Sequence, residues 1–254
     1  MLKPTDLNLR RIDIRPGHWG QWLTTGAVGL VGFVGLALLL VFGTAIRQLD
    51  HQLLLAVISI RTPELTVFAS AVTRLGSTSV VVWLGVAAAI VVGLRSRSIL
   101  LPIGLLGGLA ATSSLVTILK IALDRPRPPA SLVVGVPLSD DAFPSGHTTD
   151  GSMLVVLTAA MLALTFGNLI VRRLLMISGC MLALLIGCSR TYLGVHWPSD
   201  VLGGWLLAAT MVSVTMALVN LALAPYPGGE TAPDLLDRDA VPQVAVQRSS
   251  ASAP

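Results

Sequence analysis

Six long apolar stretches, separated by short polar segments, dominate the chain. None of the six contains a charged residue. They run from about Trp22 to Ile46, between Arg74 and Arg95, between Arg97 and Lys120, between Asp150 and Arg172, between Arg173 and Arg190, and from Val201 to about Ala224. A helix that crosses a bilayer needs roughly 20 predominantly apolar residues. The pattern therefore predicts six transmembrane helices, of which the fifth is the shortest.

The segment between the first two stretches has a different pattern. From His51 to Thr73 apolar residues alternate irregularly with Arg61, Pro63 and Glu64. This segment is too interrupted to span a membrane, and it suits a helix that lies at the interface or re-enters part of the way.

Composition shifts divide the chain into three parts. Residues 1–21 are predicted to be a cytoplasmic N-terminal segment, and residues 22–224 a six-helix membrane domain. Several basic residues precede the first apolar stretch, and it has no clear small-residue cleavage site. We therefore expect a retained helix and not a cleaved signal peptide. Residues 225–254 are rich in Pro, Gly, Ser, Asp and Ala and predict a disordered cytoplasmic tail.

Composition supports a membrane protein. Hydrophobic residues make up 54% of the 254 residues and charged residues only 12%, against about 45–50% and 25% in soluble domains. The net charge of +4 and the pI of 9.7 do not indicate nucleic acid, because the basic residues flank apolar stretches and form no dense tract. The predicted fold is all-α, a polytopic bundle of six transmembrane helices with an interfacial helix between the first two, and its partner is the lipid bilayer.

The distribution of basic residues predicts the topology. Ten of the 17 lie in the N-terminal segment, in two short connections and in the tail, namely at Lys3, Arg10, Arg11, Arg15, Arg95, Arg97, Arg172, Arg173, Arg238 and Arg248. Cytoplasmic segments carry an excess of Lys and Arg. We therefore expect an integral protein of the plasma membrane, as in a bacterial inner membrane, with the opposite helix ends on the extracytoplasmic face.

Three polar clusters fall at those extracytoplasmic ends. The first comprises Lys120 and residues 124–128, the second residues 144–147, and the third Ser189, Arg190, His196 and Asp200. Fixed cations and imidazoles in one region repel each other unless an anion lies among them. The clusters together predict a site for a multiply charged anion.

The first two clusters suit a phosphoryl group. Lys120 supplies a point charge, and the planar fork of Arg127 matches two phosphate oxygens, whereas for Arg125 we expect no more than contact with lipid headgroups. Ser145 and Gly146 precede a long apolar stretch, where free backbone N–H groups favour an anion. Taken singly, these features are equally consistent with a snorkelling lysine and an ordinary helix cap.

The two histidines suit proton transfer and nucleophilic attack. His147 lies at the start of the fourth stretch, where it can exchange a proton with bound phosphate, although a lone histidine at a helix end is more often an interfacial residue. His196 and Asp200 are four residues apart, so the carboxylate can orient the imidazole from the next helical turn. The alternative is a helix capped by Ser199 with Asp200 in its first turn.

Together these residues resemble the type 2 phosphatidic acid phosphatase superfamily, which includes lipid phosphate phosphatases, bacterial acid phosphatases and vanadium haloperoxidases. The family pattern KxxxxxxRP matches residues 120–128, PSGH matches residues 144–147, and SRxxxxxHxxxD matches residues 189–200. Order and spacing agree at every motif position over about eighty residues. The resemblance implies the membrane branch of the family.

The resemblance also implies roles for the matching residues. His196 would be the nucleophile that forms a phosphohistidine, Asp200 would orient it, and His147 would protonate the leaving group. The phosphate would be bound by Lys120, Arg127, Ser145, Gly146 and Arg190. Cationic side chains would neutralise the phosphoryl charge, so no metal ion and no cofactor is expected.

The sequence thus predicts a membrane phosphatase for a lipid phosphate or diphosphate, of the phosphatidate, phosphatidylglycerophosphate or polyprenyl diphosphate class. Two alternatives compete with it: a protein that binds or transports anionic lipids without catalysis, and a soluble acid phosphatase or haloperoxidase relative, which the apolar stretches disfavour. No sequence signal selects one lipid or an oligomeric state.

Overall fold

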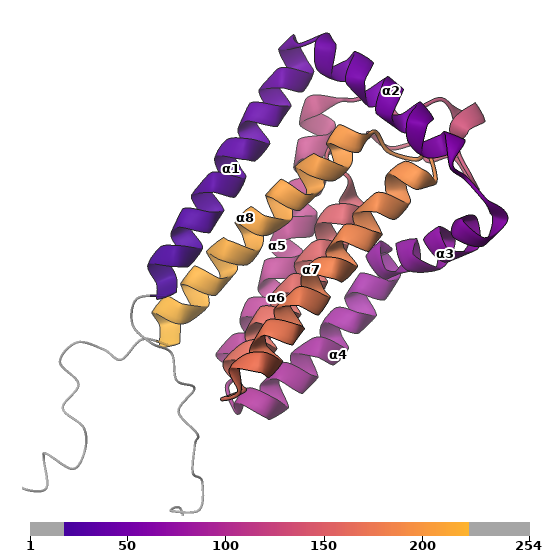
Figure 1. Cartoon of the computed structure of the whole chain (residues 1–254). Coiled ribbons are helices and arrows are strands. Elements are labelled where there is room, and N and C mark those ends of the chain that lie inside the picture. The colour runs from indigo at the N-terminus through magenta and orange to yellow at the C-terminus, as the bar shows by residue number, and fades with distance from the viewer. Residues whose placement is uncertain (1–17, 224–254) are drawn as a thin grey trace, which may run out of the picture. The chain divides into compact units, whose positions relative to one another are not determined.

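The computed structural model describes residues 18–223, and within that range every regular element is helical. Six helices are long and apolar enough to cross a membrane: α1 (His18–Phe42), α4 (Thr78–Ser96), α5 (Leu100–Leu123), α6 (Gly146–Leu164), α7 (Leu169–Tyr192) and α8 (Pro198–Leu223). Figure 1 shows them side by side in one bundle. The all-α, six-span fold predicted from the sequence is confirmed. The predictions for the start of the N-terminal segment and for the tail lie outside the described residues.

The helix bounds differ from those of the charge-free stretches that predicted them. The fifth stretch is the clearest case, because α7 has 24 residues and includes Arg172, Arg173 and Arg190. Long basic side chains at a helix end can place their charged groups at the interface while the backbone stays helical. The charges therefore lie near the start and in the last turn of α7 and do not interrupt it.

The segment between α1 and α4 forms two helices where one interfacial helix was expected. They are α2 (Ala45–Ser59) and α3 (Pro63–Thr73), and the chain bends by 120° between them. Thr62 caps α3 by accepting a 3.2 Å hydrogen bond from the N–H of Leu65. Pro63 follows at the first helical position, where its fixed φ suits a helix start. The short 3₁₀ helix η2 (Arg74–Gly76) then leads into α4.

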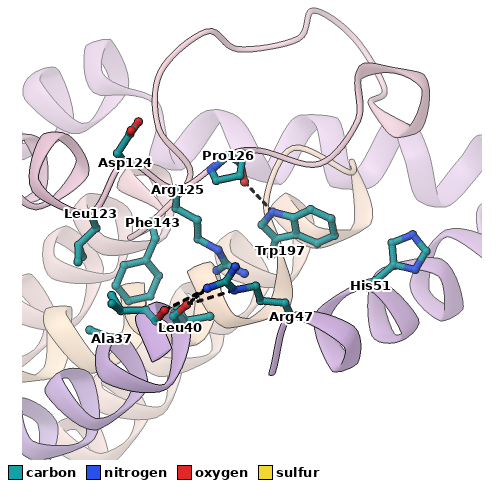
Figure 2. A pocket seen from close by; sticks show the side chains of 11 residues that line it. Ala37, Leu40, Arg47, His51, Leu123, Asp124, Arg125, Pro126, Phe143 and Trp197 are labelled. Atoms are coloured by element: carbon teal, nitrogen blue, oxygen red, sulfur yellow. Dashed lines mark hydrogen bonds between the residues drawn. The ribbon is translucent and has the colours of Figure 1, made fainter. Parts of the chain in front are cut away.

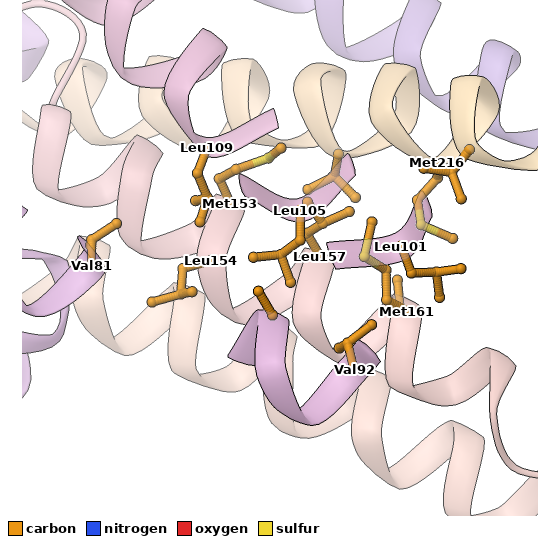
Figure 3. Close-up of a cluster of buried hydrophobic side chains, with 14 residues drawn as sticks. Val81, Val92, Leu101, Leu105, Leu109, Met153, Leu154, Leu157, Met161 and Met216 are labelled. Atoms are coloured by element: carbon orange, nitrogen blue, oxygen red, sulfur yellow. The ribbon is translucent and has the colours of Figure 1, made fainter. Parts of the chain in front are cut away.

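Helix α6 is the centre of the bundle. It packs against α4, α5, α7 and α8, and 61% of its membrane-length segment is buried, against 17% for α7. The largest buried cluster joins α4, α5, α6 and α8 around residues such as Leu101, Leu105, Met153, Leu157 and Met216 (Figure 3). A second buried cluster fixes α1 against α8 and the end of α5. Close packing in these clusters holds the helix ends in fixed relative positions.

The outer faces of the helices are apolar. Val31, Trp83, Ile121 and Leu221 each expose at least 70% of their surface. Exposed apolar area on this scale is not tolerated in water but is the expected surface towards lipid hydrocarbon. The chain is an integral membrane protein.

Four helix ends meet at one end of the bundle. The last turns of α5 and α7 lie beside the first turns of α6 and α8, and α2 crosses this end (Figure 1). Hydrogen bonds connect the segments here: Trp197 Nε1 donates to Pro126 O at 2.9 Å, and the Ser145 N–H donates to Asp200 O at 3.1 Å. All three polar clusters of the sequence are therefore brought together.

A core substitution tests this packing. Leu157 is fully buried, so Leu157→Ala is expected to destabilise the folded protein by about 2–5 kcal/mol through lost contacts and the cavity it leaves. Leu221, exposed on α8, is the matched control, and Leu221→Ala should cost less than about 1 kcal/mol. Thermal unfolding of the detergent-solubilised proteins measures both. Equal shifts in the two variants would contradict the packing described.

Candidate active site

The start of α8 holds a buried histidine and carboxylate. His196 is 1% exposed and Asp200 0% exposed. His196 Nδ1 lies 3.3 Å from Asp200 Oδ2, and the same oxygen accepts the backbone N–H of Trp197 at 2.9 Å. Of the alternative, the structure retains only Asp200 in the first turn of α8, because Ser199 lies inside the helix and its hydroxyl donates to Asp50.

The partners of His196 determine its tautomer. Asp200, as a carboxylate, can only accept, so Nδ1 carries the proton. Arg127 can only donate, and its Nη1 lies 3.0 Å from His196 Nε2, so Nε2 presents a lone pair. A neutral imidazole with its free lone pair directed at a guanidinium is the form required of a nucleophile.

The surroundings also keep this imidazole neutral. Burial above all, and then the positive charges of Arg127, Arg190 and Lys120, hold the pKa of His196 well below its ordinary value of 6.5. Desolvation and nearby cations both disfavour the imidazolium form. The lone pair on Nε2 is thus available at neutral pH and at mildly acidic pH.

The loop before α6 brings the second cluster to the same place. Ser145 caps α6: its Oγ accepts from the Thr148 N–H at 3.5 Å and from Thr148 Oγ1 at 2.9 Å, and its own backbone N–H donates to Asp200 O. The hydroxyl proton of Ser145 is not used by these bonds. A Cβ atom on Gly146 would lie 3.9 Å from Lys120 Cε, an ordinary contact, so the protein packing itself does not require glycine there. His147 follows Gly146 as the second residue of α6, where its side chain is half-buried.

Three cations, Lys120, Arg127 and Arg190, lie near His147 and His196. We refer to these three residues as the cationic cluster. Two of them share one carboxylate: Asp140 Oδ2 lies 2.6 Å from Lys120 Nζ, and Asp140 Oδ1 lies 2.7 Å from Arg127 Nη2. Lys120 also donates to the Asp141 carbonyl. The sequence argument that only a bound anion could balance these charges is therefore wrong in part, because the protein supplies one such anion itself.

Asp140 remains charged in this position. Burial raises the pKa of its carboxyl, but Lys120 and Arg127 outweigh burial and hold the pKa below the ordinary 3.8. The side chain is still 57% exposed and lies on the loop between η3 (Ala130–Leu132) and α6, so a ligand can reach and replace it. An acidic residue five positions before Ser145 was the available sequence signal.

Arg190 has no carboxylate partner among the described residues. It is 5% exposed, its Nη1 donates to Thr73 Oγ1 at 2.7 Å, and its Nε is buried with no hydrogen-bond partner. An unpaired guanidinium N–H is costly to bury. This unsatisfied donor supports a bound anion more directly than the number of cations does.

Arg125 was assigned too small a role. It reaches beneath His196, where it forms ion pairs with Asp200 and, at 2.6 Å, with Asp50 of α2. Asp50 was not predicted as a site residue, and the polar neighbours Gln48, His51 and Gln52 gave no signal that marked it. Asp124, with φ 41°, ends α5 in the left-handed conformation and turns the chain towards this position.

A cavity of about 430 Å³ lies beside Arg125. Figure 2 shows Arg125 extending from the end of α5 between Phe143 and Trp197, with Arg47 and His51 of α2 near the rim. No member of the cationic cluster lines this cavity. No group of three His, Cys, Asp or Glu side chains suited to a metal ion occurs within residues 18–223.

Known proteins are similar to this chain over the same region. The PAP2 superfamily profile matches residues 101–223. An undecaprenyl-diphosphatase from Sulfolobus acidocaldarius is 34% identical over 133 residues, covering 50% of this chain and 59% of that protein. A phosphatidylglycerophosphatase B from Bacillus subtilis is 32% identical over 168 residues, covering 64% of this chain and 79% of that protein.

The fold is also similar to a solved structure. The crystal structure of a transmembrane PAP2 type phosphatidylglycerolphosphate phosphatase from Bacillus subtilis superimposes with a TM-score of 0.71 and 26% sequence identity. The match covers 76% of this chain and 95% of the other. The two proteins thus share the fold of the membrane bundle.

Removing the Asp140 charge tests how the cationic cluster is balanced. Asp140→Asn is expected to strengthen the binding of inorganic vanadate by about three- to tenfold, because the anion no longer competes with a partly exposed carboxylate for Lys120 and Arg127. Equilibrium binding to purified protein measures the effect. Asp124→Asn removes a nearby exposed charge that no hydrogen bond or ion pair holds, and should leave binding unchanged. Weaker vanadate binding by Asp140→Asn would contradict the competition.

Proposed function

The chain belongs to the PAP2 superfamily, and on this basis we propose that it is a membrane phosphatase that hydrolyses a lipid phosphate or diphosphate through a phosphohistidine intermediate. One observation carries the proposal: the neutral, fully buried His196 directs its Nε2 lone pair towards Arg127, while Asp200 holds the opposite ring nitrogen. This arrangement suits in-line attack on a phosphoryl group bound by the cationic cluster.

In the first step His196 Nε2 attacks phosphorus and the bond from phosphorus to the lipid oxygen breaks. The incoming phosphoryl group displaces Asp140 from Lys120 and Arg127 and takes the place of Arg127 at Nε2. His147 protonates the departing oxygen, which leaves as an alcohol or as a lipid monophosphate. Asp200 stabilises the positive charge that develops on the imidazole.

In the second step a water attacks the phosphohistidine. His147, now neutral, accepts a proton from this water, the N–P bond breaks, and inorganic phosphate leaves. Throughout, Lys120, Arg127 and Arg190 hold the non-bridging oxygens, with the Gly146 amide and the unused Ser145 hydroxyl proton as further donors. The fixed cations supply the charge stabilisation that a metal ion supplies in other phosphoryl-transfer enzymes.

The position of the site suits a substrate that remains in the bilayer. The helix ends lie at the membrane surface, where a lipid headgroup can reach the cationic cluster while its hydrocarbon stays among the apolar helix faces. The relatives named above act on undecaprenyl diphosphate and phosphatidylglycerophosphate. We propose a substrate of this class, or phosphatidate, and place the site on the extracytoplasmic face of a bacterial inner membrane.

Phosphate release by the purified protein tests the proposal. Undecaprenyl diphosphate, phosphatidylglycerophosphate, phosphatidate and a soluble phosphate ester are assayed side by side, with and without chelator. His196→Ala is expected to lower kcat by at least about 1,000-fold. With a substrate that carries labelled phosphate, this variant should also show no labelled protein after quenching without acid, because no phosphohistidine forms. His51, an exposed histidine of α2, is the matched control and His51→Ala should keep full activity. Anion binding without turnover would favour a lipid-binding or transport protein, and loss of activity with chelator would contradict the metal-free mechanism.

The pH dependence provides a separate test. The attacking imidazole must be neutral, and the lowered pKa of His196 means that it stays neutral as pH falls through 6.5. The acid limb set by His196 therefore lies below pH 6.5, where activity is lost as pH falls through the folded-state pKa. The acid limb of kcat/KM should have its midpoint below pH 6.5. A midpoint at or above that value would show that His196 is not in the environment described.

A further inference from the structure

A buried network, which we call the Asp50–Arg125–Asp200 network, connects α2 to the start of α8. Arg125 Nη1 bonds to Asp200 Oδ1 and, at 2.7 Å, to Ser199 Oγ, while Nη2 bonds to Asp50 Oδ2 at 2.6 Å. The exposed fractions of the side chains are 12% for Arg125, 3% for Asp50 and 0% for Asp200. Two carboxylates thus share one guanidinium almost out of contact with solvent.

Every side-chain oxygen of this network has a partner of the right kind. The Ser199 N–H donates to Asp50 Oδ1 at 2.9 Å, and its hydroxyl donates to Asp50 Oδ2 at 2.5 Å while accepting from Arg125. Asp50, on α2, therefore caps the first turn of α8 from another helix. A buried network in which every carboxylate and hydroxyl oxygen is satisfied favours one geometry.

The network determines which oxygen of Asp200 faces His196. Arg125 holds Oδ1, so Oδ2 is left to accept from His196 Nδ1 and from the Trp197 N–H. Arg125 also supplies the positive charge that a buried carboxylate needs in order to stay ionised. Neither Arg125 nor Asp50 contacts His196 itself or any member of the cationic cluster.

Loss of Arg125 would change the tautomer of His196. An uncompensated buried carboxylate takes up a proton, and a protonated Asp200 donates to Nδ1 instead of accepting from it. The ring proton then resides on Nε2, and the lone pair faces away from the phosphoryl group. The nucleophile would be present but unable to attack.

We propose that Arg125 and Asp50 are positioning residues that keep Asp200 ionised and oriented, and with it the reactive tautomer of His196. The inference rests on the proposed phosphatase function. It makes α2 part of the catalytic apparatus, since α2 supplies the carboxylate that orients Arg125 and the first turn of α8.

Steady-state kinetics of Arg125→Met tests the inference. We expect kcat to fall by about 100-fold or more, while KM and the affinity for vanadate stay within about threefold, because the cationic cluster is unchanged. Asp50→Asn should lower kcat by about tenfold, again with little change in KM, since its amide cannot accept from both Arg125 and Ser199 through two oxygens. Arg125→Lys should recover only part of the loss, because a point charge does not bridge two carboxylates.

Arg47→Met is the matched control. Arg47 lies one turn before Asp50 on α2 and anchors that helix by donating to Leu40 O at 3.0 Å and Val41 O at 3.1 Å, but it makes no bond to the network. It should keep kcat within about threefold of the unchanged protein. A loss in Arg47→Met equal to that in Arg125→Met would assign Arg125 to holding α2 in place and would overturn the inference.

Two further measurements keep the test decisive. If Arg125→Met does not fold, Arg125→Lys and Asp50→Asn carry the same prediction, and unchanged kcat in both would overturn it. In folded Arg125→Ala, added guanidinium at millimolar concentration should restore part of kcat. If removing Arg125 has no effect on kcat, the inference is overturned. Wild-type activity that is lost in His196→Ala but kept in Arg125→Met would reject this inference alone, whereas an inactive wild-type protein would reject the proposed function and the inference together.

Discussion

The buried carboxylate of Asp200 is the group on which the rest of the site depends. A charge with no solvent exposure is stable only when several donors surround it, and the donors here come from two separate parts of the chain. His196 and the Trp197 N–H belong to the start of α8, and Arg125 follows α5. The Asp200 carbonyl also holds the Ser145 N–H at the start of α6. Satisfying this one residue therefore assembles three helix ends.

The bilayer explains why the site forms at the helix ends. Charged groups are costly within hydrocarbon, so a six-span chain collects them at the surfaces. Antiparallel packing then brings alternate helix ends together, and α6, the most buried helix, holds its neighbours at a fixed spacing. The resulting concentration of cations is balanced in two ways. Asp140 pairs with Lys120 and Arg127, whereas Arg190 keeps an unsatisfied donor. The site is thus ordered without ligand and yet suited to an anion.

The site is arranged so that a phosphoryl group can replace the carboxylate of Asp140. The Asp140 carboxylate is held by ion pairs but is more than half exposed, so it prevents repulsion between the cations without blocking a doubly charged phosphoryl group. The Asp200 carboxylate is held by similar partners but is fully buried, so no ligand can replace it. Exposure, and not charge, distinguishes the replaceable carboxylate from the permanent one. The same distinction separates groups that would bind phosphate from groups that would orient the nucleophile.

The sequence by itself determined the helical class, the six spans and the identity of the charged and imidazole side chains at one membrane surface, because apolar run length and motif spacing are local properties. It also indicated the His196–Asp200 pair, since four residues span one helical turn. The roles of Arg125, Asp50 and Asp140, and the bend between α2 and α3, were decided by tertiary structure. Arg125 and Asp50 are 75 positions apart, and no local pattern states that they meet. Which cation is paired, and which donor is left for a ligand, depends on contacts that exist only after the helix ends have packed together.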